Sequence, residues 1–132
     1  MTIVDDYSRY IWIFLLKQKF EVVKTLENFV FVQTQFETTI KIIRSDNETE
    51  FFMTNLFVNK GIMHQTSCVN TPQQNNIVER KHGHVLNVAR ALMTQSHLPK
   101  IYWSYFVIHV VHIINMFLTH VLNYSSILLL IQ

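Results

Sequence analysis

Apolar residues follow two different periods along the chain, and each period predicts a kind of element. Short runs rich in β-branched and aromatic side chains predict strands. The first two runs are separated by a polar stretch, residues 5–10, and predict a β-hairpin. The runs that predict strands cover residues 2–4, 11–16, 40–43 and 62–69.

Helical spacing of apolar residues marks the other segments. A helix is expected over residues 21–36, and a short one over 54–59 that ends at Gly61. A long helix is expected from Asn75, with Val78, Val85, Ala89 and Leu92 on one stripe. Pro99 marks a boundary, and residues 100–118 predict a second long helix. This order predicts an α/β fold in which helices pack on a mixed sheet.

The last predicted helix is the most apolar part of the chain. All Asp, Glu, Lys and Arg residues except Lys100 lie within residues 1–90. Polar side chains nevertheless form one stripe of this helix, which favours packing on a sheet or on a partner chain over a membrane span. The stripe consists of Ser104, His109, His112 and Asn115.

Composition limits the class of protein. A length of 132 residues allows one domain. Because 49% of the residues are hydrophobic and 15% charged, disorder is not expected. A net charge of +2 permits a nucleic-acid partner without arguing for one. Cys68 is the single cysteine, which excludes an intrachain disulfide.

Two carboxylates are candidates for metal chemistry. Asp46 follows a predicted strand, and Glu79 lies 33 residues later, near the start of a predicted helix. Carboxylates from separate elements can converge on Mg²⁺, which prefers oxygen ligands. Taken alone, each also fits a structural role, Asp46 as a turn or capping residue and Glu79 as a partner of the helix dipole.

Other titratable residues are assigned structural roles. Asp5 and Asp6 are expected to cap the turn beside Ser8 and to pair with Arg9. His82 and His84 are two residues apart, and on a helix such residues do not face one another, so they are not expected to share a metal ion.

Four segments resemble the catalytic core of copia-type retrotransposon integrases, in the same order and across nearly the whole chain. They are TIVDDYSRYIW (2–12), IRSDNETEF (43–51), KGIMHQTSCVNTPQQNNIVERKHGH (60–84) and LPKIYWSYFVIHVVHIIN (98–115). The resemblance implies a ribonuclease H-like fold over residues 1–123, followed by a degenerate tail at 124–132. It also implies DNA integration by metal-dependent strand transfer.

The resemblance assigns residues to roles. Asp46 and Glu79 match two of the family's three catalytic carboxylates, which bind Mg²⁺ or Mn²⁺ in a two-metal arrangement. Arg80 and Lys81 would neutralise DNA phosphates, and Gln74 and Asn75 would hydrogen-bond nucleic acid. The resemblance implies DNA as the partner, and a second copy of the chain is a further candidate. Binding to a membrane is not expected. A functional protein would be located in the nucleus.

Departures from the family pattern predict a defective enzyme. The position of the first carboxylate would fall upstream of Met1, so the first strand and its aspartate are expected to be missing. Glu48 stands where the family has glycine, and Gly83 stands where it has a basic residue. Two remaining carboxylates should hold metal weakly, and we expect strand transfer to be lost. The alternative is a non-catalytic nucleic-acid-binding remnant of a retrotransposon polyprotein.

Overall fold

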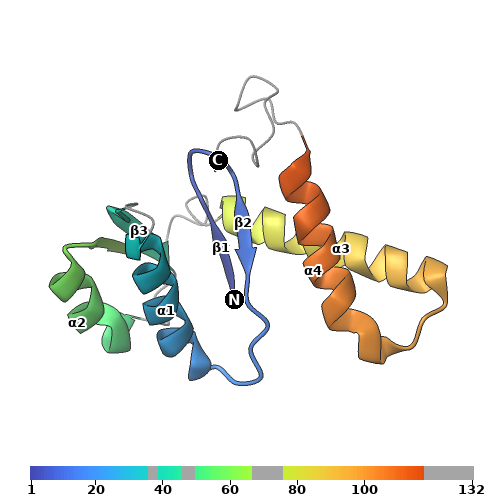
Figure 1. Ribbon diagram of the computed structural model, residues 1–132, viewed down its shortest axis with the longest axis horizontal. Helices are drawn as coiled ribbons and strands as arrows, with labels where there is room; N and C mark the ends of the chain where they lie inside the picture. The colour runs from blue at the N-terminus through green and yellow to red at the C-terminus, as the bar shows by residue number, and fades with distance from the viewer. Residues whose placement is uncertain (36–38, 46–49, 67–75, 118–132) are drawn as a thin grey trace. The chain divides into compact units, whose positions relative to one another are not determined.

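The computed structural model describes residues 1–35, 39–45, 50–66 and 76–117. The chain divides into two compact units. Figure 1 shows the elements coloured by residue number. Unit 1 comprises Met1–Leu15 and Ile77–Gln132, and unit 2 comprises Leu16–Asn76. The described residues form four α-helices, one 3-10 helix and four short strands, so the predicted α/β class is confirmed.

Unit 1 is built on a β-hairpin. Strand β1 (Thr2–Val4) pairs antiparallel with β2 (Ile11–Ile13), with Ile3 opposite Trp12. Both segments were predicted, although β2 ends at Ile13 rather than at residue 16. The hairpin is followed in this unit by helix α3 (Asn76–Ser96), the 3-10 helix η3 (Lys100–Tyr102) and helix α4 (Trp103–Met116).

The core of unit 1 joins the hairpin to both long helices. Its buried side chains come from β2, α3 and α4, and Val85 and Ala89 have no exposed surface. They lie four residues apart, one turn along α3, as the predicted stripe requires. Leu92, assigned to the same stripe, is instead 38% exposed. The buried set is Ile11, Val85, Ala89, Val107, Val110 and Val111.

One polar side chain is buried beside this core. Asn115 of α4 is 3% exposed, and its Oδ1 accepts a hydrogen bond from the Ile11 backbone N–H at 3.0 Å. Its Nδ2 donates to the Ile11 carbonyl at 2.9 Å. The predicted polar stripe of α4 is therefore divided, because His109 and His112 are exposed whereas Asn115 fixes the helix to β2.

Unit 2 pairs two parallel strands. Strand β3 (Ile42–Ser45) lies beside β4 (Met63–Thr66), with Ile43 opposite His64 and Ser45 opposite Thr66. Helix α1 (Glu21–Gln35) precedes β3, and helix α2 (Glu50–Lys60) connects the two strands. The buried residues Leu26 and Val30 come from α1 and Phe57 comes from α2, and the buried Ile62 lies between α2 and β4.

Several predicted boundaries shift in unit 2. The strand expected over 40–43 instead covers Ile42–Ser45, because Arg44 and Ser45 extend the ladder opposite Gln65 and Thr66. Helix α2 is longer than the predicted segment. Gly61 directly follows it and terminates the helix as expected, with a φ of 66°. The strand predicted over 62–69 is described to Thr66, and residues 67–69 lie outside the described part.

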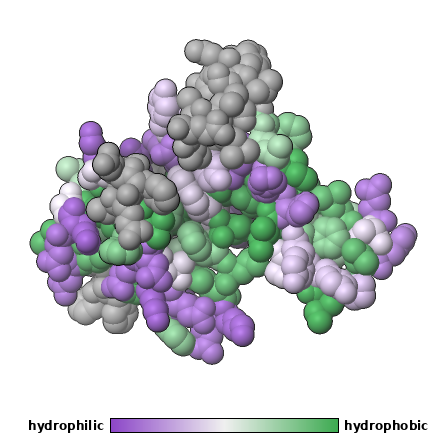
Figure 2. All heavy atoms as spheres, in the orientation of Figure 1, coloured by the Kyte–Doolittle hydropathy of each residue, from purple (hydrophilic) through white to green (hydrophobic). Residues whose placement is uncertain are grey.

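Two further observations concern the predicted architecture. The described strands form one antiparallel pair and one parallel pair. Within the described residues, no helix is long and apolar enough to cross a membrane. Hydrophobic side chains still reach the surface, as the green areas of Figure 2 show. The exposed hydrophobic residues include Ile101 of η3, Tyr105 and Ile108 of α4, and Phe117, which directly follows α4.

Candidate functional site

The candidate carboxylates lie in different units and are described to different extents. Glu79 belongs to the first turn of α3 in unit 1 and is exposed. Asp46 directly follows Ser45, the last residue of β3 in unit 2, so the predicted strand does precede it. Asp46 itself lies outside the described residues, as do Glu48, Gln74 and Asn75.

Glu79 presents an accessible oxygen donor. Among the described residues, none forms a hydrogen bond or ion pair with its carboxylate, and its position in the first turn of α3 suits a negative charge. Oxygen donors of this kind match the preference of Mg²⁺ and Mn²⁺. The part of the chain that the structure describes holds no cluster of three or more His, Cys, Asp or Glu side chains able to bind a metal.

The strand end before Asp46 carries a defined contact. Ser45 Oγ and His64 Nε2 lie 2.8 Å apart, and the His64 ring lies against Phe57, with ring centroids 4.7 Å apart. The contact of His64 with Ser45 was not predicted from the sequence. The place of His64 opposite Ile43 in the parallel ladder explains why it reaches Ser45.

The predicted DNA-binding cations on α3 occupy different surroundings. Arg80 is exposed, whereas Lys81 is half-buried. Lys81 lies four residues before the buried Val85, so it shares the core-facing side of α3. Burial, reinforced by the positive charge of Arg9, lowers the pKa of Lys81 below the ordinary lysine value. The sequence contained this signal, because Lys81 falls on the predicted Val78–Val85 stripe.

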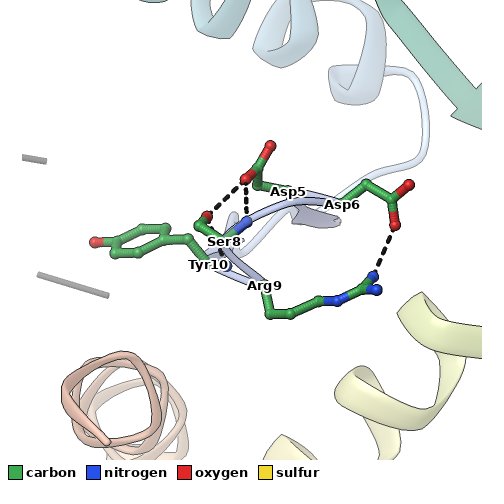
Figure 3. Close-up of polar contacts among 5 residues, drawn as sticks. All are labelled: Asp5, Asp6, Ser8, Arg9 and Tyr10. Atoms are coloured by element: carbon green, nitrogen blue, oxygen red, sulfur yellow. Dashed lines mark hydrogen bonds and ion pairs between the residues drawn. The ribbon is translucent and has the colours of Figure 1, made fainter. Parts of the chain in front are cut away.

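Asp5 and Asp6 stabilise the hairpin turn, as predicted (Figure 3). Asp5 Oδ2 accepts hydrogen bonds from the Ser8 backbone N–H and from Ser8 Oγ, both at 2.6 Å. Asp6 Oδ1 pairs with Arg9 Nη1 at 2.7 Å. These contacts are the structural roles assigned to the two aspartates.

Helix α3 is also tied to the first strand. Thr2 Oγ1 and His82 Nδ1 lie 2.8 Å apart although the two residues are 80 positions apart in the sequence. This contact places the residues after Glu79 beside the hairpin within unit 1. It was not predicted, because nothing in the local pattern of either segment refers to the other.

The comparisons with known proteins supply the context for these residues. The chain is 37% identical over 125 residues to the retrovirus-related Pol polyprotein from transposon RE1 of Arabidopsis thaliana, covering 93% of the chain and 8% of that protein. The homologues of this chain are retrovirus-related Pol polyproteins of plant transposons. No family model matches the chain.

Two more Pol polyproteins support this relationship. The one from transposon RE2 of Arabidopsis thaliana is 37% identical over 93% of the chain and 9% of its own length. The one from transposon TNT 1-94 of Nicotiana tabacum is 29% identical over 87% of the chain and 9% of its own length. The chain therefore spans less than a tenth of these Pol polyproteins.

Proposed function

We propose that this chain corresponds to the integrase-core region of a Pol polyprotein, with a ribonuclease H-like fold and DNA as its partner. The observation that carries the proposal is the 37% identity over 93% of the chain to transposon Pol polyproteins. The α/β element order and an exposed glutamate directly before two cations on α3 fit the same proposal. The two strand pairs would then belong to one mixed sheet.

In this proposal Asp46 and Glu79 hold Mg²⁺ or Mn²⁺ through carboxylate oxygens. When bound, the metal would lower the cost of charge on the attacking and leaving oxygens of a phosphodiester exchange. Arg80 and Lys81 bind the DNA backbone and hold it beside Glu79, because cations neutralise phosphates at any sequence. Gln74 and Asn75 contribute amide hydrogen bonds to the nucleic acid.

A second candidate function is DNA binding without turnover. Asp5 and Asp6 are already engaged by Ser8 and Arg9. The 132 residues then supply two carboxylates where the resemblance implies three. Metal affinity should be low and strand transfer absent, while the cations of α3 remain available to DNA.

Binding of the full chain to duplex DNA at several salt concentrations, with a strand-transfer assay in Mg²⁺ and in Mn²⁺, tests both functions. We expect affinity to fall with salt and no strand transfer. Arg80→Gln should reduce the slope of log affinity against log salt by about 0.9, the contribution of one phosphate. Arg90→Gln, also on the exposed side of α3, is the matched control and should change the slope less.

The outcomes distinguish the two proposed functions from each other, and they also show when neither function is correct. Strand transfer that Asp46→Asn abolishes would establish an active integrase core and reject the binding-only alternative. DNA binding without turnover supports the alternative. Affinity that does not depend on salt, or no binding at low salt, would contradict both.

A further inference from the structure

The parallel strands of unit 2 have one exposed face and one half-buried face. Ser45 and His64 are half-buried, whereas Arg44 and Gln65, their neighbours in the two strands, are exposed. Burial alternates because successive side chains of a strand point to opposite faces. Ile43 is paired with His64 in the ladder, so Ser45, two residues further along β3, lies on the same face as His64. The imidazole is therefore within reach of the end of β3.

Two contacts fix the imidazole of His64 on this half-buried face. Its Nε2 lies 2.8 Å from Ser45 Oγ, which is hydrogen-bond distance. Its ring lies against Phe57 of α2, which is 2% exposed, with ring centroids 4.7 Å apart and ring planes at 33°. The buried Phe57 restricts the orientation of the imidazole, and the hydrogen bond joins it to the last residue of β3. His64 thus links α2, β4 and the end of β3 within one unit.

The end of β3 is where the chain leads into a candidate metal ligand. The described ladder ends with the pair Ser45 and Thr66, and Asp46 follows Ser45 directly. Consecutive Cα atoms are only about 3.8 Å apart, so the placement of Ser45 limits where the next carboxylate can lie. Segments held by few contacts open locally at little cost in free energy. A side-chain hydrogen bond at Ser45 therefore bears on the residue that follows it.

We propose that His64 is a positioning residue for metal binding, which holds Ser45 and thereby directs the carboxylate of Asp46. This inference rests on the proposed function, in which Asp46 is a metal ligand. His64 acts through Ser45 rather than by binding the ion itself. Groups that orient metal ligands commonly change metal affinity by about 10- to 100-fold, and we expect the lower end of this range because Ser45 stands between His64 and the ligand.

The Mn²⁺ affinity of the full chain, measured from the free ion by electron paramagnetic resonance, tests this role with two contrasting substitutions. His64→Phe keeps a ring beside Phe57 but has no hydrogen-bonding atom, so it should weaken Mn²⁺ binding by about tenfold. His64→Gln loses the ring but places an amide near the position of Nε2, so it should stay within about twofold of the wild type. A residue that served only the packing of unit 2 would give the reverse order.

The partner of His64 provides an independent variant. Ser45→Ala removes only the hydroxyl and should weaken Mn²⁺ binding as much as His64→Phe does. The double variant should be little worse than either single one, because both substitutions remove the same hydrogen bond. Urea unfolding shows whether each variant is folded. If His64→Phe does not fold, Ser45→Ala still decides.

Gln65→Leu is the matched control on the exposed face of the same strands. It removes the Gln65 Oε1 that accepts a hydrogen bond from Arg44 Nε at 2.9 Å. A contact between β3 and β4 is lost in this variant as well, but the Ser45–His64 contact is not. The Mn²⁺ affinity should therefore change by less than about twofold.

Asp46→Asn separates failure of this inference from failure of the proposed function. If Asp46→Asn weakens Mn²⁺ binding but Ser45→Ala and His64→Phe bind as the wild type does, the positioning role is overturned and the proposed function stands. The role is also overturned if His64→Phe keeps the affinity and His64→Gln loses it. A wild type that binds no Mn²⁺, or an Asp46→Asn variant that binds it equally well, would reject the proposed function and with it the role of His64.

Discussion

Asn115 connects two segments that are 104 residues apart in the sequence. A buried backbone N–H or C=O without a partner is costly, and in Ile11 both groups are satisfied by this one amide. Asn115, the one polar residue among the buried side chains of α4, is thus a structural residue of unit 1. Leucine, although similar in size and apolar, could not replace it.

We predict that Asn115→Leu lowers the free energy of unfolding by about 2–4 kcal/mol, because both backbone groups of Ile11 lose their partners. Urea unfolding of the full chain measures the effect. Asn87→Leu makes the same change on the exposed side of α3 and should stay within about 0.5 kcal/mol of the wild type. Equal effects of the two substitutions would show that the Asn115 contacts add nothing.

The sequence predicted some side-chain contacts and missed others. The Asp5–Ser8 and Asp6–Arg9 contacts were predicted, because turn residues bond to neighbours three positions away. The role of Asn115 and the Thr2–His82 contact were not, because their partners lie far along the chain. Local spacing carries no information on which distant backbone a side chain meets.

At the scale of elements, the two glycines act in opposite ways, one directly after the end of α2 and one inside α3. Gly61 ends α2 with φ of 66°, its N–H bonded to the Val58 carbonyl and the Ile62 N–H to the Phe57 carbonyl. This is the Schellman arrangement, which requires a left-handed residue. Gly83 instead lies inside α3, and a Cβ added there would meet no atom within 4 Å.

Alanine should therefore change stability in opposite directions at the two positions. Gly83→Ala should raise the free energy of unfolding by about 0.5–1 kcal/mol through helix propensity. Gly61→Ala should lower it by about 1 kcal/mol, because the added Cβ opposes a positive φ. Urea unfolding of both variants decides the matter, and a loss of stability in Gly83→Ala would contradict the description of α3.

Element types were easier to predict than element ends. The strands and helices were found because apolar periodicity reflects burial on one side of an element. Their ends moved where polar residues continue a ladder, as Arg44 and Ser45 do in β3. The 3-10 turn at Lys100–Tyr102 was likewise included in one long predicted helix.

For the whole molecule, the sequence predicted an α/β class that the described elements confirm. The single mixed sheet and the convergence of Asp46 with Glu79 remain predictions, since they require segments from both units. Pairing between such segments depends on long-range contacts, which periodicity does not specify. The similarity to Pol polyproteins is what makes one shared metal site the most economical proposal.

The central claim is that Asp46 and Glu79 hold the same divalent ion, and Mn²⁺ affinity tests it most directly. The full chain, Asp46→Asn, Glu79→Gln and the double variant would each be titrated with Mn²⁺. The concentration of free Mn²⁺ would be measured by electron paramagnetic resonance, which gives the affinity. Glu27→Gln, which changes an exposed glutamate of α1, is the control.

If the two carboxylates share an ion, each single substitution should weaken Mn²⁺ binding by at least about tenfold, since removing groups that merely orient a ligand already has effects of that size. The double variant should then be little worse than either single one, because residues on one ligand are not additive. A shared site would be contradicted if the losses of Mn²⁺ affinity in the two single variants added up in the double variant. It would also be contradicted if the single variants bound Mn²⁺ as tightly as Glu27→Gln does.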